Sequence, residues 1–206
     1  MASTERYKWI VIFALASLAI FAGCSTSRSI NELPTGRVVR ERDQIRNITR
    51  VRLNLEHTNA EERLSPFINT KQSFLKEYQN EGEETITVFE VFRMQPNSFP
   101  VENTIYIAAG NTSIAILTTR IDFTEVARLI TTDSNTGGTS PQAVQPITNF
   151  ENYVATRFTY NLSPQVVELI QRSNRISFRY YSGADMVTIR LSFADIRNLR
   201  RFLNTR

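Results

Sequence analysis

The chain has 206 residues, of which 41% are hydrophobic and 21% are charged, and its formal net charge is +4. This composition is typical of one globular domain and excludes a collagen-like, disordered or disulfide-rich chain. One cysteine and one histidine cannot form a His/Cys zinc cluster or an internal disulfide, so we predict no metal and no cofactor. The small positive excess also gives no reason to expect a nucleic-acid partner.

The first 23 residues have the organisation of a secretory signal. Arg6 and Lys8 precede a run without charge, residues 9–21, and the small pair Ala22-Gly23 follows it. A positive start, a short apolar run and small residues are typical of a signal peptide that is removed. A helix over residues 9–24 would be about 24 Å long, which is too short to span a bilayer comfortably.

The only cysteine, Cys24, directly follows this run. The segment Phe21-Ala22-Gly23-Cys24 resembles the lipobox of bacterial lipoproteins, although Leu is more usual than Phe at its first position. The resemblance implies a thioether-linked lipid on Cys24, cleavage between Gly23 and Cys24, and acylation of the new amino terminus, for example with palmitate. Ser25, in place of Asp, is compatible with transfer to the outer membrane. The alternative is an ordinary signal peptide with an incidental cysteine.

After cleavage, residues 24–46 are expected to form a tether, and residues 47–206 one folded domain. The mature chain has 22 basic and 19 acidic residues, a formal charge of +3. Its densest basic cluster consists of Arg37, Arg40, Arg42, Arg46, Arg50 and Arg52, interrupted by Glu41 and Asp43. Two interpretations stay open, a solvated segment with local ion pairs and an attraction to anionic lipid or cell-wall polymer.

Hydrophobic periodicity predicts more strands than helices. The expected strands are 48–56, 84–94, 104–109, 112–121, 151–161, 175–181 and 186–191. The expected helices are 70–79, 122–129, 193–204 and one that begins after Ser163 with Pro164 at its first position. Because strand 84–94 is apolar on both faces, we expect it in the middle of a sheet.

A pattern of hairpin and helix occurs twice. Asp122 and Ser192 each stand where a helix cap would follow the second strand, and an acidic residue, Glu125 or Asp195, comes three positions later. We therefore predict an α+β fold, one largely antiparallel sheet with helices on one face, built from duplicated β(α)ββα units at 84–131 and 151–204. Chance similarity is the alternative. The connector 132–149 is either functional or only mobile.

The sequence offers little material for catalysis. His57 has no recognisable nucleophile nearby and is not expected to be catalytic. Carboxylates are available at Glu83, Glu84, Glu90, Asp122, Glu125, Asp133, Asp185 and Asp195. The segment that begins at Asp133 is a weak match to a calcium loop, because its twelfth position is Val144 and not Glu. We predict that the protein is not an enzyme.

One predicted hairpin carries a candidate binding face. Tyr181 shares its strand face with Arg179, and the neighbouring strand can add Arg190. These three residues could contact an envelope protein or a glycan, and a plain solvated face is the alternative. Phe158, Tyr160, Phe178 and Tyr180 are expected in the core.

These features together predict a lipid-anchored cell-envelope protein in the outer membrane, bound to the membrane through Cys24, on its periplasmic or its surface side. It would act as a non-catalytic binding or structural module. A lipid-anchored, carboxylate-dependent hydrolase is the alternative, and an assembly subunit with an exposed apolar patch is a third possibility.

Overall fold

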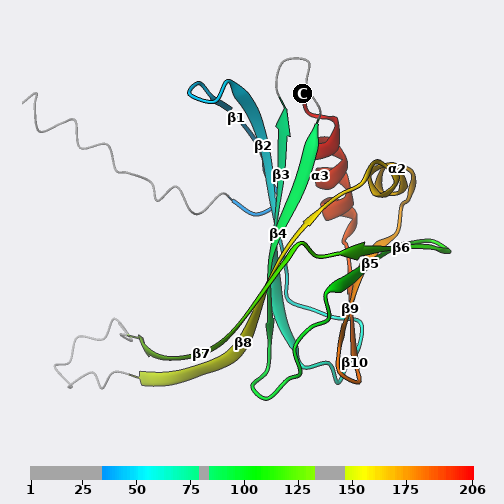
Figure 1. The fold of residues 1–206 in the computed structure, drawn as a ribbon. Coiled ribbons are helices and arrows are strands. Elements are labelled where there is room, and N and C mark those ends of the chain that lie inside the picture. Colours follow the sequence, from blue (N-terminus) through cyan, green and yellow to red (C-terminus); the bar gives the residue numbers. More distant parts are fainter. Residues whose placement is uncertain (1–33, 79–83, 133–146) are drawn as a thin grey trace, which may run out of the picture. The chain divides into compact units, whose positions relative to one another are not determined.

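The computed structural model describes residues 34–78, 84–132 and 147–206, which belong to one compact unit, Pro34–Arg206. Ten strands and two helices occur in these residues (Figure 1). The predicted signal, its cleavage site and Cys24 lie outside the described residues, as does the weak calcium-loop match. Within the described part of the chain, neither helix is long and apolar enough to cross a membrane.

The strands form two antiparallel sheets. The strands are β1 (Val38–Asp43), β2 (Ile48–His57), β3 (Phe67–Tyr78), β4 (Thr85–Met94), β5 (Thr104–Ala109), β6 (Thr112–Leu117), β7 (Arg120–Thr132), β8 (Ile147–Asn161), β9 (Ile176–Ser182) and β10 (Asp185–Arg190). The helices are α2 (Pro164–Arg172) and α3 (Phe193–Asn204). The six-stranded sheet has the order β1-β2-β3-β4-β8-β7, and the four-stranded sheet has the order β10-β9-β5-β6.

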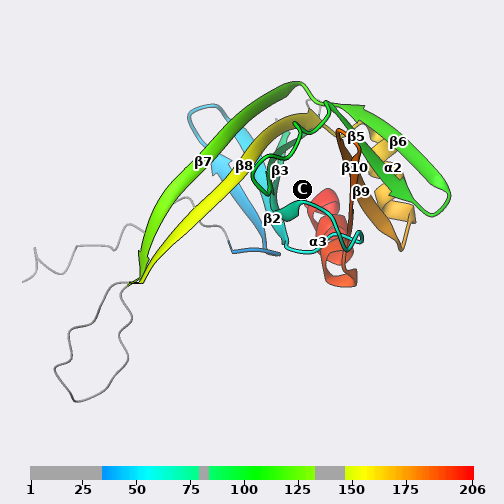
Figure 2. The same ribbon diagram turned by 90° about the horizontal axis from the view of Figure 1, so that it is seen from below.

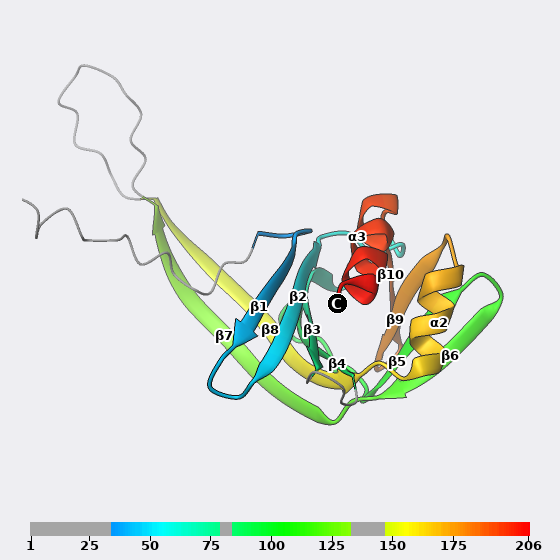
Figure 3. The ribbon, with the colours of Figure 1, turned by 90° about the horizontal axis from the view of Figure 1, so that it is seen from above.

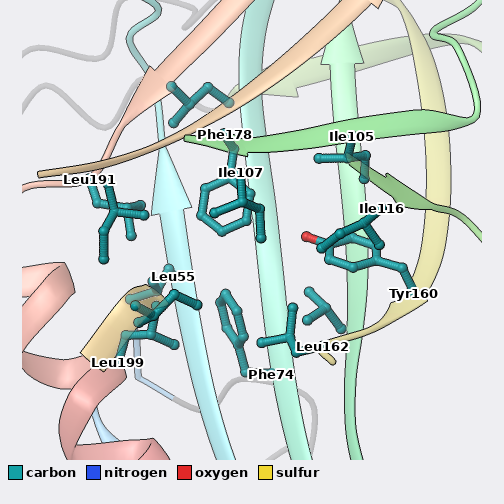
Figure 4. Close-up of a cluster of buried hydrophobic side chains, with 14 of the residues drawn as sticks. Leu55, Phe74, Ile105, Ile107, Ile116, Tyr160, Leu162, Phe178, Leu191 and Leu199 are labelled. Atoms are coloured by element: carbon teal, nitrogen blue, oxygen red, sulfur yellow. The ribbon is translucent and has the colours of Figure 1, made fainter. Parts of the chain in front are cut away.

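The core lies between the inner faces of the two sheets. In β2, β3, β4, β5 and β9, alternate residues point into it, as in Ile176, Phe178 and Tyr180 of β9, and their neighbours point outward. Figure 4 shows side chains from β2, β3, β5, β6, β8 and β9 meeting there, together with Leu199 of α3. The expected core aromatics Phe158, Tyr160, Phe178 and Tyr180 are all buried.

The two helices complete this core. α3 packs on β2, β1 and α2, and α2 packs on β5. Figures 2 and 3 both show α3 between β2 and β9, with α2 beside β5 and β6. Arg200 of α3 donates to the carbonyl oxygens of Ile170 and Ser173 at the end of α2, at 3.3 and 2.7 Å. The carbonyls that a helix leaves unpaired at its end thus receive a cation.

The helix predictions near the C-terminus are confirmed. Ser163 caps α2, accepting from the Val166 amide at 3.4 Å, and Pro164 occupies its first turn. Ser192 caps α3 and forms a reciprocal capping box with Asp195. Local sequence determines both ends, because each cap needs only residues within the same turn.

Two other helix predictions are wrong. Residues 70–78 belong to β3, where all of them pair with β2 and residues 70–77 also pair with β4, while residue 79 lies outside the described residues. The side chains of Thr70, Gln72, Phe74 and Lys76 alternate on its buried face. The sequence suggested a helix because polar side chains occupy three of these four inward positions, so the two-residue period was not visible in hydrophobicity.

Residues 122–129 form part of β7 instead of a helix. β7 pairs with β8 over its full length, and Asp122 lies opposite Arg157 in this ladder. The cap-like spacing of Asp122 and Glu125 was therefore a coincidence, overridden by pairing with a distant strand. The predicted strand 112–121 accordingly ends at Leu117, and the chain crosses to the other sheet before β7 begins.

The predicted α+β class is wrong, because the protein is mostly antiparallel β with two sheets and, in the described residues, two helices. The unit 151–204 has its two predicted helices, α2 and α3, whereas the one helix predicted in 84–131 is part of β7. Nor do the units form one sheet, since β4, β7 and β8 lie in one sheet and both hairpins in the other. Equivalent strands of the two segments do pair, β4 with β8 and β5 with β9.

Two further expectations concern placement. Strand 84–94 was expected in the middle of a sheet, and β4 lies between β3 and β8. Residues 38–43, which we assigned to the tether, instead form β1 and pair with β2. Charged side chains at four of its six positions hid this strand from the hydrophobicity pattern.

Candidate functional site

The predicted binding residues lie on the outer face of the four-stranded sheet. Arg179 and Tyr181 are on β9 and Arg190 is on β10. The register places Arg179 opposite Thr188 and Tyr181 opposite Met186. The Arg179 Nε donates to the Thr188 hydroxyl at 3.3 Å.

Tyr106 of β5, which was not among the predicted binding residues, lies on the same face. Arg179 pairs with Tyr106 across the β5–β9 ladder, and the rings of Tyr106 and Tyr181 are 5.7 Å apart at 87°. This edge-to-face contact is a favourable aromatic geometry. The alternation of Ile105, Tyr106 and Ile107 is the local signal that could have placed this aromatic side chain on the outer face. Its neighbour on β9 depends on a long-range pairing that the sequence does not reveal.

Arg190 already forms an ion pair within the chain. Its Nε lies 2.6 Å from Oε1 of Glu61, in the segment between β2 and β3. The Glu61 amide also donates to the Thr188 carbonyl at 2.9 Å, and the Thr188 amide donates to Oε2 of Glu62 at 2.7 Å. This segment covers the edge of β10. We therefore define the tyrosine face as Tyr106, Arg179, Tyr181 and Met186, without Arg190.

One end of the tyrosine face is held by a tight contact. The Ser182 hydroxyl donates to the Phe99 carbonyl at 2.5 Å, and the Glu102 amide donates to the Tyr181 carbonyl at 2.8 Å. Gly183 has φ +59°, and a Cβ there would lie 2.6 Å from the Phe99 ring. Only glycine fits this turn. Two hydrogen bonds and the Gly183 turn therefore fix this end of the face.

A second cluster of polar groups is buried in the core, around Glu90 of β4. The Glu90 carboxyl accepts from the hydroxyls of Tyr180 at 2.6 Å, Thr70 at 2.9 Å and Tyr160 at 3.0 Å, and from the Gln72 amide at 3.3 Å. These donors come from β3, β8 and β9, so the cluster joins both sheets. Glu90 is 1% exposed.

Burial controls the protonation of this cluster. It raises the pKa of Glu90, although the four hydrogen bonds lower it in part. Burial and the neighbouring carboxyl also raise the pKa of Tyr160 and Tyr180, which therefore keep their protons as donors. The Gln72 side-chain oxygen has no hydrogen-bond partner among the described residues. The Glu90 carboxyl is thus enclosed by its own hydrogen-bond donors.

His57 and Lys76 are two further polar residues that face the core. Burial lowers the pKa of His57, and its Nε2 has no hydrogen-bond partner within the described part. Burial also lowers the pKa of Lys76, while nearby Glu84 opposes this shift. The Lys76 ammonium donates to the Leu203 carbonyl at 2.8 Å and so caps the end of α3. Both residues are therefore buried in the core and do not line an open site.

Among the residues that the structure describes, the candidate carboxylates do not converge. Glu84 pairs with Lys76, Asp195 belongs to the α3 cap, and Glu90 is enclosed. In the described ranges, no group of three or more His, Cys, Asp or Glu residues could hold a metal ion. Glu83 and Asp133 lie outside these ranges.

The basic cluster occupies the β1–β2 hairpin. Arg50 contacts Asp43 at 3.3 Å and Glu77 at 2.7 Å, and its pKa is raised chiefly by the hydrogen bond to Glu77. Arg52 lies 3.9 Å from Glu41. Local ion pairs thus account for part of the cluster, whereas Arg37, Arg40 and Arg46 are exposed and make none with the described residues. Ile45 at the hairpin turn is 98% exposed.

Comparison with known proteins adds no further constraint. No protein-family model, no curated protein and no solved structure matches the chain. The described residues form a two-sheet antiparallel β protein. Its core encloses the polar cluster around Glu90, and its four-stranded sheet carries the tyrosine face on the outside.

Proposed function

We propose that the protein is a non-catalytic binding module of the cell envelope, anchored in the outer membrane through lipidated Cys24, and that the tyrosine face contacts an envelope protein. The observation that carries this proposal is the Tyr106–Tyr181 pair on an open sheet face, beside Arg179 and Met186. Tyrosine and arginine are over-represented among residues that dominate protein interfaces. The rigid sheet behind them limits the entropy lost on binding.

A protein partner suits this geometry better than a glycan. A sugar ring stacks on an aromatic ring that lies flat on the surface, and two such rings form a platform when they are coplanar. The two tyrosine rings are instead nearly perpendicular. Met186, which is 37% exposed, adds a flexible apolar side chain of the kind that adapts to a protein surface.

The alternative of a carboxylate-dependent hydrolase gains no support from the geometry. Such an enzyme needs at least one acid or base in contact with substrate. Within the described ranges, Glu90 is the carboxyl whose pKa is raised, yet it is 1% exposed and bonded to donors from both sheets. Its arrangement fits a structural role in joining the sheets.

The anchor and the basic hairpin are consistent with one another. The β1–β2 hairpin begins soon after the proposed lipid, and residues 37–52 contain six arginines and two acidic residues. Anionic lipid attracts each exposed arginine by about 1 kcal/mol close to the surface. The exposed Arg40 and Arg46 would therefore add an electrostatic contact to the lipid anchor.

Site-specific photo-crosslinking in cells tests the proposed face. A photoreactive phenylalanine analogue replaces Met186, and the same analogue at Ile45, which is 98% exposed on the β1–β2 hairpin, is the control. We expect a discrete adduct with an envelope protein at position 186, absent at position 45, and lost when Tyr181→Ala is added. Tyr181→Phe should retain it, because the ring is kept.

Two results would contradict the proposal. One is the absence of any adduct at position 186. The other is co-sedimentation of the protein with purified cell-wall sacculi that Tyr181→Ala abolishes, because the face would then bind a glycan.

A further inference from the structure

The free edge of β6 differs from the other sheet edges in the described residues. β1 carries charges at Arg40, Glu41, Arg42 and Asp43, and β7 carries Asp122 and Glu125. The edge of β10 is covered by the segment that contains Glu61 and Glu62. Charges and covering segments are the devices by which proteins prevent sheet edges from pairing. β6, Thr112–Leu117, has no charge, no proline and no covering segment among the described residues.

The backbone of β6 offers a defined set of unpaired groups. A two-residue turn, Gly110-Asn111, joins β5 to β6, and Gly110 has φ +61°. Such a turn closes on a hydrogen-bonded pair, here Ala109 and Thr112, so even-numbered residues of β6 bond to β5. The bond from the Thr118 amide to the Asn103 carbonyl, 2.9 Å, continues this alternation. The amides and carbonyls of odd-numbered residues therefore point away from the sheet.

These odd-numbered residues are Ser113, Ala115 and Leu117, and all three side chains are exposed. Leu117 is 69% exposed, so a strand that pairs with β6 could bury part of its apolar surface. We propose that β6 pairs antiparallel with β6 of a second copy of this chain, about a two-fold axis at Ala115. The four-stranded sheet would then become one continuous sheet of eight strands.

The side chains of β6 complement themselves in this register. Ala115 faces Ala115 of the other copy, so the centre of the contact is small and the backbones can approach. Leu117 faces Ser113 of the other copy, a large residue opposite a small one. No other register pairs all three outward residues of each strand. β6 has no charge that could select a charged partner strand. An identical neutral strand meets no charge repulsion there.

Pairing would also have a consequence for the tyrosine face. Ala115 lies directly beside Tyr106 in the β5–β6 ladder, on the same face. The dimer would therefore carry two tyrosine faces on one sheet, facing the same way. Two faces on one rigid sheet increase the effective concentration of the second contact. The pairing itself does not rest on the proposed partner.

Thiol crosslinking of the full chain in its membranes tests the pairing. Ala115→Cys places two thiols opposite each other, with Cα atoms about 5.5 Å apart in a hydrogen-bonded pair. A short bismaleimide should convert this variant to a dimer at least about tenfold faster than Glu125→Cys, an exposed control on the β7 edge. Adding Leu117→Lys should weaken the dimer, because each leucine opposite Ser113 of the other copy would be replaced by a charged side chain on the pairing edge.

The outcomes separate this proposal from the proposed anchor. The unaltered chain has Cys24 as its only thiol, so a crosslinked dimer of that chain would report an unmodified Cys24 and would not bear on β6. Equal rates for Ala115→Cys and Glu125→Cys would overturn the pairing. A crosslink from position 115 to a different protein would overturn it as well, because the edge would then have another occupant.

Discussion

Glu90→Ala should cost more stability than any single loss of a surface carboxylate in this protein. Removing the carboxyl deprives four donors of an acceptor at once. Two of them keep a second contact, since Thr70 donates to the Val91 carbonyl at 3.1 Å and the Gln72 amide to the Tyr180 hydroxyl at 3.2 Å. The hydroxyls of Tyr160 and Tyr180 lose the acceptor that joins them to β4.

The magnitude follows from these contacts. A buried donor without an acceptor costs about 1–3 kcal/mol, and two donors are affected. The void left by the missing methylene and carboxyl groups costs about 1 kcal/mol more. The variant no longer has to bury a carboxyl group, and this offsets part of the loss. We expect the free energy of unfolding to fall by about 3–5 kcal/mol. Glu90→Gln should cost about 1 kcal/mol, because Gln72 can turn its unpartnered oxygen toward the new amide.

Urea unfolding followed by far-UV circular dichroism measures both changes. Glu168→Ala is the matched control, an exposed helical partner of Arg172 whose loss should cost about 0.5 kcal/mol or less. A double-mutant cycle with Tyr180→Phe should show that the two substitutions are less than additive. If Glu90→Ala changed the free energy of unfolding by no more than Glu168→Ala, Glu90 would not join the sheets as argued.

Four further outcomes are expected. Burial raises the pKa of Glu90, so the folded state holds this proton more tightly than the unfolded chain does. The free energy of unfolding should therefore fall as pH rises above about 4.5. Glu90→Gln should flatten that slope in urea titrations. Burial lowers the pKa of Lys76, so stability should instead rise as pH approaches 10.5, and Lys76→Met should remove that rise. Gly183→Ala should lower the melting temperature more than Gly110→Ala, because both have positive φ but only the first meets a ring, that of Phe99; equal losses would contradict this reasoning. Ser192→Ala should cost about 1 kcal/mol through loss of the α3 cap, measured by urea unfolding, and Ser192→Thr should restore most of it.

The sequence predicted those elements whose signals are local. α3 begins at its capping box and ends at Asn204, as expected, because Ser192 and Asp195 act within one turn. The β9–β10 hairpin was recognisable from two alternating strands around a glycine turn. In these places, propensity, capping and burial all favour the same structure.

The failures occurred where distant pairing determines the structure. β3 buries Thr70, Gln72 and Lys76, and nothing local shows that Glu90 and Leu203 supply their partners. The division into two sheets depends on the crossing at Thr118, which the sequence does not mark. The Glu90 cluster was missed for the same reason, although Glu90 was one of the carboxylates considered. A charged residue in the middle of an apolar strand was its only local signal.

The anchor at Cys24 is the part of the account from which location and function both follow. Intact mass and membrane fractionation of the native protein, beside a Cys24→Ser variant, test it most directly. We predict a mass increase of diacylglycerol and acyl size on a chain that begins at Cys24, together with membrane association, both lost in the variant. An unmodified Cys24 in a soluble or uncleaved chain would contradict the anchor and the envelope function built on it.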